Sequence, residues 1–212
     1  MDSFDHNKII NEVASEVLKP QGLLRKGKSR TWMDDNGWFT TVVEFQPSGF
    51  SKGTYLNVGI SFNWYKKDSL SFDYGSRESE FVLADNPDVF RECVTELAKY
   101  GLNKVIEYRS FRSVKFAEKT LLKNYSNNHN QMWRHYHQGM ICILSRNLRK
   151  AVVYFNEVLK IKSDVQYIID LQDDVKTILG TISNNTLTLS YIEDLIKETR
   201  SKLKLPDAEI LI

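Results

Sequence analysis

Apolar residues recur at helical spacing near the N-terminus. Between residues 4 and 18, the apolar positions that fall on one face of a helix are Ile10, Val13, Ala14, Val17 and Leu18. Pro20 and Gly22 then interrupt the pattern, because neither residue supports a continuing helix. The spacing predicts a helix over residues 4–18 that packs through this stripe.

The pattern then changes to strict alternation. In YLNVGISFNW, residues 55–64, every second residue from Leu56 to Trp64 is apolar, and most of the residues between them are polar. Side chains of a strand point alternately to its two faces, so this alternation predicts a strand with one buried face.

Further strands are expected on both sides of this one. Asn36-Gly37 lies between two extended runs and suits a type I′ turn, so residues 28–35 and 38–46 should form a hairpin. Alternation in residues 69–75 and the short run 79–84 add one or two strands. The sequence therefore predicts four or five antiparallel strands.

A second helix is predicted after the sheet. Asn86 can cap it, Pro87 suits its first position and Gly101 can end it. Its apolar stripe is formed by Phe90, Cys93, Val94 and Leu97. Both N-terminal helices need an apolar partner, and the Leu56 to Trp64 face of the sheet offers one.

The rest of the chain has only helical patterns. Residues 124–130, NYSNNHN, are polar and turn-prone, and they predict a boundary between two parts of the chain. Apolar stripes then begin at Met132 and Leu148. We therefore expect an α+β domain over residues 1–123 and a domain or appendage of three to four antiparallel helices over residues 131–205.

Two capping patterns refine the helical part. Ser163 with Gln166 and Ser190 with Glu193 match the S/T-x-x-E/Q capping box, which predicts two helix starts. Gly180 predicts the end of the helix between them.

Composition and charge narrow the choice of function. The chain has 212 residues, and 42% of them are hydrophobic, which is enough for a sizeable core. Its 29 basic and 27 acidic residues leave a net charge of only +2, so no overall field attracts nucleic acid or anionic membranes. The N-terminus lacks the pattern of a signal peptide, and the two cysteines, Cys93 and Cys142, fit apolar helix faces as reduced thiols. A cytoplasmic protein is expected.

Catalytic signatures are missing from the sequence. It contains no phosphate-binding loop, no dinucleotide-binding glycine motif, no H-E-x-x-H, no C-x-x-C and no G-x-S-x-G motif. Of the four histidines, His129, His135 and His137 lie close together, but residues two apart on a helix point in different directions. We expect solvated or capping histidines, no metal, no cofactor and no catalytic residues.

The polar face of the sheet is a candidate binding surface. Glu44 and Gln46 on one strand can lie beside Asn57, Ser61 and Asn63 on the next. One face of an antiparallel sheet commonly meets solvent, so these residues can simply be hydrated. If the helical part covers them instead, they line a cleft that suits binding better than catalysis.

The stretch RKGKSRTW, residues 25–32, is a second candidate surface. In an extended strand, Lys26, Lys28, Arg30 and Trp32 would project in one row, as three cations beside an aromatic ring. Such a row can bind phosphate, nucleic acid or an acidic protein, or it can be a solvated edge strand that resists aggregation. We expect Trp32 itself to pack in the core.

Three segments carry a resemblance to a known family. GLLRKGKSRTW (residues 22–32) occupies the place of a G-F-x-K-K-x-G-x-x-(F/Y/W) pattern, and VVEFQPS (42–48) and YLNVGIS (55–61) follow it. Residues 5 to about 120 thus resemble an uncharacterised bacterial domain-of-unknown-function family. The resemblance implies a small α+β domain without an established activity.

Together these observations favour a non-catalytic binding or interaction protein of the bacterial cytoplasm. The expected partner is another protein. A partner with an acidic surface would complement the basic strand. The alternative is binding of nucleic acid or phosphate through the basic strand 25–32, either by a binding protein or as part of an enzyme that carries none of the motifs above.

Overall fold

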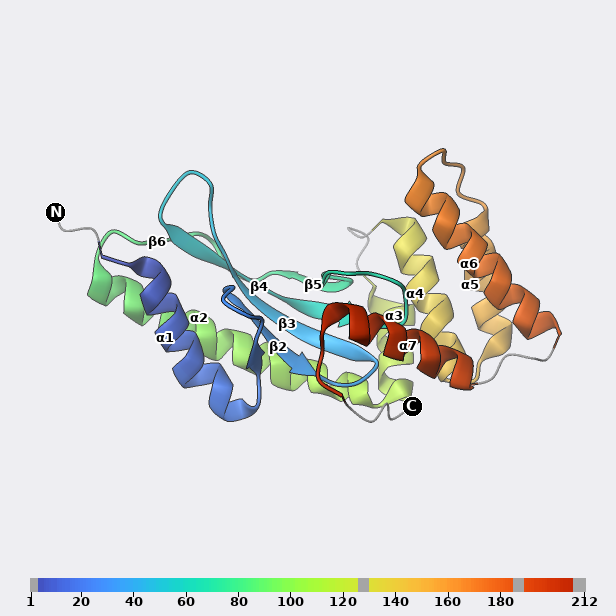
Figure 1. Ribbon diagram of the computed structural model, residues 1–212, viewed down its shortest axis with the longest axis horizontal. Helices are drawn as coiled ribbons and strands as arrows, with labels where there is room; N and C mark the ends of the chain where they lie inside the picture. Colours follow the sequence, from blue (N-terminus) through green and yellow to red (C-terminus); the bar gives the residue numbers. More distant parts are fainter. Residues whose placement is uncertain (1–3, 126–129, 185–188, 208–212) are drawn as a thin grey trace. The chain divides into compact units, whose positions relative to one another are not determined.

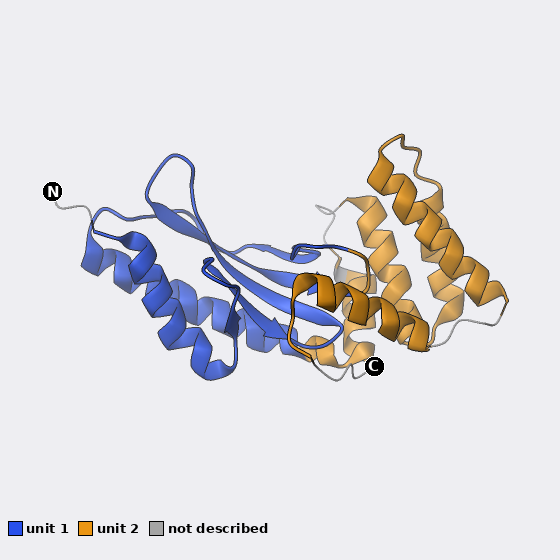
Figure 2. Cartoon of the chain, viewed as in Figure 1, with its two compact units in different colours: residues 1–63, 67–109 blue, residues 64–66, 110–212 orange. Residues whose placement is uncertain are grey.

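The chain folds into two compact units, each formed from two segments of the sequence. The structure, a computed structural model, describes residues 4–125, 130–184 and 189–207. Unit 1 comprises Met1–Asn63 and Lys67–Arg109, and unit 2 comprises Trp64–Lys66 and Ser110–Ile212 (Figure 2). The division at residue 110 precedes the expected boundary at 124–130, of which residues 126–129 lie outside the described part of the chain.

Unit 1 contains an antiparallel sheet. Its strands are β1 (Leu24–Arg25), β2 (Thr31–Asp35), β3 (Phe39–Gln46), β4 (Gly53–Phe62), β5 (Tyr74–Arg77) and β6 (Val82–Leu83). The order is β1-β2-β3-β4-β5, and β6 also pairs with β4, at its first residues. The predicted α+β class is confirmed, with six strands of which two are only two residues long. The alternating run 69–75 becomes a strand only from Tyr74 onward, because Asp73 and the residues before it form a loop.

The predicted hairpin is confirmed, but its turn type is wrong. Asp35 pairs with Thr40, and the Asn36 N–H donates to the Phe39 carbonyl at 2.9 Å. Gly37 has φ 76°, whereas Asn36 has no positive φ. A type I′ turn needs positive φ at two successive residues, and glycine alone at the first central position is typical of a type II′ turn.

Two helices, α1 (His6–Leu18) and α2 (Pro87–Tyr108), lie side by side on one face of the sheet (Figure 1). Asn86 caps α2 as predicted, since its side chain accepts from the Asp88 and Val89 N–H groups. The buried residues common to the predicted and observed stripes of these helices are Ile10, Val13, Ala14, Leu18, Phe90 and Val94.

Gly101 does not end α2, which continues to Tyr108. A Cβ atom at Gly101 would lie 3.2 Å from Val43 Cγ1 and 3.6 Å from Leu56 Cδ1, on β3 and β4. The glycine therefore lets the middle of the helix lie close against the sheet, and its role is in packing and not in termination.

Buried charge fixes the end of α2. Arg109 Nη2 donates to Asp34 Oδ1 at 2.7 Å and to the Gln21 carbonyl at 2.9 Å, and its Nε donates to Asp34 Oδ2 at 3.2 Å. This two-point contact with Asp34 raises the pKa of Arg109. The pair joins β2 to the C-terminal end of α2 within unit 1.

Unit 2 is helical. Its helices are α3 (Val114–Asn124), α4 (Gln131–Leu144), α5 (Leu148–Leu159), α6 (Gln166–Ser183) and α7 (Leu189–Leu203). Helix α4 packs against both α3 and α5, and α5 packs against α6 (Figure 1). A Cβ atom at Gly139 would lie 2.5 Å from the Phe155 ring, so this glycine sets the close approach of α4 to α5.

The predicted capping boxes are wrong. The N-cap of α6 is Val165, the residue before the helix begins, and the Ser163 hydroxyl instead accepts from the Val165 N–H. Ser190 lies inside α7 and is helical, so it is not the residue that caps this helix. Helix α6 also passes through Gly180 and ends at Ser183. None of the helices in the described ranges is long and apolar enough to cross a membrane.

Candidate ligand-binding site

The basic stretch does not form a cationic row. The Lys26 N–H donates to the Thr31 carbonyl at 2.9 Å, the Ser29 N–H donates to the Lys26 carbonyl at 3.1 Å, and Gly27 has φ 56°. Residues 26–30 are therefore the turn that joins β1 to β2. Because alternate residues share one side only in an extended chain, the expected row of Lys26, Lys28 and Arg30 is wrong.

Arg30 is directed back into unit 1. Its Nη1 donates to the Gly53 carbonyl at 3.1 Å, its Nε donates to Asn7 Oδ1 at 2.7 Å, and its Nη2 lies 3.0 Å from His6 Nε2. Burial and the positive charge of Arg30 lower the pKa of His6. Arg30 thus joins the start of α1 to the start of β4, while Lys28 is exposed.

Part of the expected polar surface does come together on the sheet. Asn57 Nδ2 donates to Glu44 Oε2 at 2.8 Å and to Gln46 Oε1 at 2.9 Å. Arg77 donates to the same Gln46 oxygen at 2.9 Å, and its guanidinium lies 4.0 Å from the Tyr55 ring centroid. These side chains form hydrogen bonds with one another, so they make a structural network across β3, β4 and β5.

Ser61 and Asn63 belong elsewhere, because both are fully buried. Asn63 Nδ2 donates to the Gly37 carbonyl at 2.8 Å and so braces the β2–β3 turn. Ser61 Oγ accepts from Lys67 Nζ at 2.9 Å. The expectation that both line a solvated face or an open cleft is wrong, because residues at the end of β4 are covered on both faces.

Lys67 is the centre of a buried polar cluster that sequence reasoning missed. Its Nζ donates to Ser61 Oγ, to Ser71 Oγ at 2.8 Å and to Asp73 Oδ2 at 3.2 Å, and Asp73 Oδ2 also accepts from the Phe62 N–H at 2.8 Å. Burial lowers the pKa of Lys67 to about 8, against the opposing charge of Asp73. Lys67 thus connects Ser61, which is fully buried on β4, to Ser71 and Asp73, which follow in the loop before β5. The cluster therefore anchors the β4–β5 loop.

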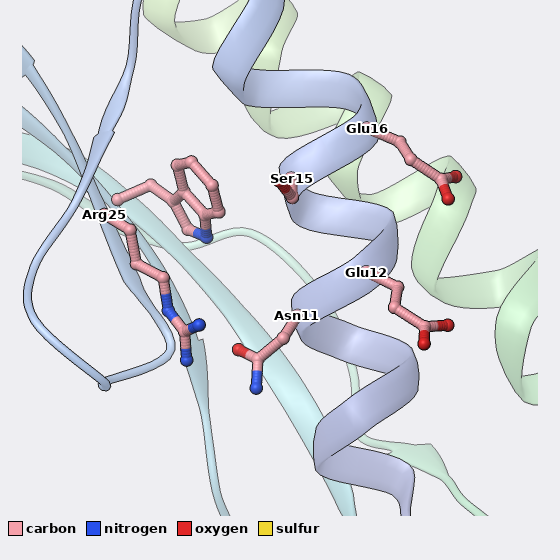
Figure 3. Close-up of a pocket in the computed structure, with 6 residues that line it drawn as sticks. Asn11, Glu12, Ser15, Glu16 and Arg25 are labelled. Atoms are coloured by element: carbon pink, nitrogen blue, oxygen red, sulfur yellow. The ribbon is translucent and has the colours of Figure 1, made fainter.

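A pocket beside Trp32 is the strongest candidate site in unit 1 (Figure 3). It has a volume of about 420 Å³. Helix α1 and strands β1 and β2 supply its lining residues, which are Asn11, Glu12, Ser15, Glu16, Arg25 and Trp32. Trp32 is only 3% exposed, as the sequence predicts for a packed ring. The helical residues come from adjacent positions on successive turns of α1, a juxtaposition that sequence reasoning did not find.

Two polar atoms in this lining lack hydrogen-bond partners. Trp32 Nε1 and Asn11 Oδ1 are both buried, and neither has a partner within the described residues. An unsatisfied buried donor or acceptor costs about 1–3 kcal/mol. Both atoms belong to residues that line the pocket but have almost no exposed surface, so a bound group can reach them only if side chains of the lining move.

Arg25 adds positive charge to the pocket. Its Nε donates to the Ser29 carbonyl at 2.7 Å and its Nη2 donates to the Lys28 carbonyl at 2.8 Å, which fixes the guanidinium while other N–H groups remain for a ligand. Figure 3 shows the Glu12 and Glu16 side chains directed away from Arg25 and Asn11. Glu12 also forms an ion pair with Arg91 on α2. Arg25 is thus the one cation among the six lining residues, and it can pair with a carboxylate of a ligand on the side of the pocket away from Glu12 and Glu16.

The structure contradicts the expectation for His137 and confirms the one for Cys142. His137 is fully buried, and its Nδ1 accepts from Trp64 Nε1 at 3.0 Å, so a solvated role for it is wrong. His135 is half-buried and lies 3.3 Å from Gln138 Oε1, whereas His129 lies outside the described residues. Cys142 is buried as predicted, and burial raises the pKa of its thiol to about 12. Across the described ranges, no three His, Cys, Asp or Glu side chains form a group that could hold a metal.

Comparisons with known proteins give no match. No family model fits the chain, and neither the curated proteins nor the solved structures include one that is significantly similar to it. The resemblance to an uncharacterised bacterial family therefore stays a prediction.

Proposed function

We propose that the protein is a non-catalytic binding protein that takes an acidic segment of another protein into the pocket beside Trp32. Arg25, which lines the pocket with N–H groups left for a ligand, supports the proposal together with the unpaired Trp32 Nε1 and Asn11 Oδ1 of the same lining. An aspartate or glutamate residue of a peptide offers a carboxylate for Trp32 and Arg25 and a main-chain N–H for Asn11.

The competing hypothesis is phosphate or nucleic-acid binding through residues 25–32. This hypothesis requires Lys26, Lys28 and Arg30 to lie in one row. The turn at residues 26–30 separates these three cations. The Arg30 guanidinium contacts Asn7 and Gly53. A phosphate-binding surface draws its affinity from several accessible cations, so the acidic-peptide hypothesis fits the site better.

The indole N–H of Trp32 gives a direct test by proton–nitrogen NMR on the full chain. N-acetyl-aspartate amide should shift this resonance saturably, and Trp32→Phe should remove it and so identify it. N-acetyl-asparagine amide, which lacks the charge, should bind about tenfold more weakly, since hydrogen bonds to a charged group contribute about 1.5–3 kcal/mol.

Two variants separate the proposed site from general surface charge. Asn11→Asp keeps the size of the side chain but adds negative charge, and it should weaken binding of the acidic probe. Lys28→Gln removes a cation from the same hairpin outside the pocket lining and should leave binding unchanged. Equal losses in Lys28→Gln and Asn11→Asp, or tight salt-sensitive binding of an oligonucleotide instead of the peptide, would contradict the proposal and favour the alternative.

A further inference from the structure

A second pocket lies within unit 2. It has a volume of about 580 Å³. The segment 64–66, helix α4 and helix α6 supply its lining, which consists of Tyr65, Lys66, Trp133, Tyr167, Asp170, Leu171 and Asp174. The four α6 residues are spaced i, i+3, i+4 and i+7, so they lie on one face of that helix. This pocket shares no residue with the one beside Trp32.

Aromatic rings form much of the pocket lining. The Tyr65 and Trp133 ring centroids are 4.8 Å apart at an interplanar angle of 45°. Trp133 also stacks on His137 with ring centroids 5.7 Å apart. Tyr167 on α6 is 54% exposed, which leaves its ring accessible. Faces of aromatic rings carry partial negative charge and attract cations, with tryptophan the strongest of them.

The segment that carries Tyr65 is anchored inside unit 2. The Tyr65 carbonyl accepts from Thr199 Oγ1 at 2.9 Å, and the Trp64 carbonyl accepts from the Tyr136 hydroxyl at 3.2 Å. Trp64 Nε1 donates to His137 Nδ1. A rigid lining of this kind reduces the entropy lost when a ligand binds.

Carboxylates supply the charge of the pocket. Asp170 and Asp174 line it one helical turn apart, and Gln166 Nε2 donates to Asp170 Oδ1 at 2.8 Å. Partial burial raises the pKa of Asp174, and the neighbouring charges of Asp170, Asp173 and Glu198 raise it further against the opposing effect of Lys66. The lining therefore has more negative than positive charge, and it carries that charge beside exposed aromatic surface.

We infer that this pocket binds an organic cation, whose charge is borne by a methylated ammonium or a guanidinium group, between the aromatic rings and the two carboxylates. Inorganic cations would gain little from the rings, and neutral ligands would gain nothing from the carboxylates. Lys66 is exposed at the pocket, and its positive charge repels a bound cation. Removal of this charge should therefore strengthen binding, whereas removal of a carboxylate should weaken it.

Tryptophan fluorescence of the full chain can report this binding. Trp32, Trp38 and Trp64 are at most 3% exposed, whereas Trp133 is half-buried and lines the pocket. Choline and N-acetylarginine amide should each change the emission saturably, and the tighter of the two identifies the preferred cationic group. The neutral isostere of choline, 3,3-dimethyl-1-butanol, should bind at least fivefold more weakly. Trp133→Phe should abolish the signal.

Matched variants test the origin of the affinity. Asp174→Asn and Tyr167→Leu should each raise the Kd about two- to fivefold, in line with exposed ion pairs and cation–π contacts. Tyr167→Phe keeps the ring and should bind as the wild type does. Asp164→Asn makes the same charge change at an exposed residue just before the same helix, outside the lining, and should leave the Kd nearly unchanged, whereas Lys66→Gln should lower it.

Three results would overturn the inference. Equal binding of choline and its neutral isostere would show a merely apolar pocket. Equal losses in Asp164→Asn and Asp174→Asn would show a diffuse surface charge. A wild-type protein with no saturable response to either cation would show that the pocket is not a cation site. All of these variants lie in unit 2, so their outcome is independent of the test of the Trp32 pocket.

Discussion

Lys67 should make the protein more stable as the pH rises. A lysine in an ordinary salt bridge has a raised pKa and has the opposite effect. Its side chain is 8% exposed and its pKa is lowered from 10.5 to about 8, mainly by burial. Between pH 8 and pH 10.5 the unfolded chain retains a proton that the folded chain has released. The unfolded state then binds more protons, so the free energy of unfolding rises with pH in this window.

The size of the effect follows from the difference between the two pKa values. Each unit of pKa corresponds to about 1.4 kcal/mol, so Lys67 contributes a gain on the order of 3 kcal/mol between pH 8 and pH 10.5. Below pH 8 both states hold the proton and the contribution is constant. Other groups also titrate in alkali, among them Cys142, whose pKa is raised to about 12. The difference between the wild type and a Lys67 variant isolates the lysine.

The assay is urea unfolding of the wild type and Lys67→Met, followed by circular dichroism at pH 7, 8, 9 and 10. At pH 7 the variant should already be less stable, because Asp73 loses its cation, and Lys67→Met/Asp73→Asn should recover part of the loss. The wild type should gain stability relative to Lys67→Met as the pH rises above 8. Lys28→Met, which removes an exposed lysine, should follow the wild type. A constant difference between wild type and Lys67→Met from pH 8 to pH 10 would refute the reasoning, since it would mean that folding does not lower the pKa of Lys67.

Four further predictions concern packing, the basic stretch and thiol reactivity. In urea unfolding, Arg30→Ser should lose about 1.5–3 kcal/mol, because the guanidinium bonds to Gly53 and Asn7, whereas Lys28→Ser should stay within about 0.5 kcal/mol; equal effects would contradict this difference. Trp32→Ala should lose about 3–5 kcal/mol by the same measurement, and a loss below about 1 kcal/mol would show that the ring is not part of the core. Gly139→Ala should lower the free energy of unfolding by about 1–3 kcal/mol, because the new Cβ clashes with Phe155. Gly180→Ala should raise it by up to about 1 kcal/mol, because its Cβ meets nothing within 4 Å. Calorimetry checks both, and changes of the same sign in the two variants would contradict the packing argument. Iodoacetamide at pH 8, followed by mass spectrometry, should modify half-buried Cys93 well before Cys142, and the reverse order would contradict the burial of the Cys142 thiol.

Local sequence signals predicted the elements whose causes are local. The helix at α1, the Asn86 cap, the hairpin around Gly37 and the long strand β4 each depend on spacing or on residues within a few positions. Gly101 shows the limit of this reasoning. Glycine commonly ends helices, but here the sheet residues that make it necessary are more than forty positions away, and no local pattern reveals them.

The candidate sites were harder to predict, because tertiary contacts decide which polar groups are already used. Alternation correctly placed Asn57 beside Glu44 and Gln46, since register alone brings them together. It could not show that Ser61 is covered by Lys67, because that depends on how the β4–β5 loop folds back. It also could not place Asn11 near Trp32. The only available signal was a polar residue near the buried stripe of the first helix.

The basic stretch shows why charge density along a chain is a poor guide to a binding surface. Four cations occur within six residues, but Gly27 turns the chain between them and each has a different environment. Arg25 bonds to the carbonyls of Lys28 and Ser29, and Arg30 bonds to Asn7 and Gly53, so both guanidinium groups stabilise unit 1. Arginine suits these positions because its planar group donates several hydrogen bonds at once, whereas the lysine ammonium is a compact charge on a flexible stem. Arg25 therefore suits a ligand in the pocket because its guanidinium is fixed and still has N–H groups to donate, whereas the number of nearby cations indicates no binding surface.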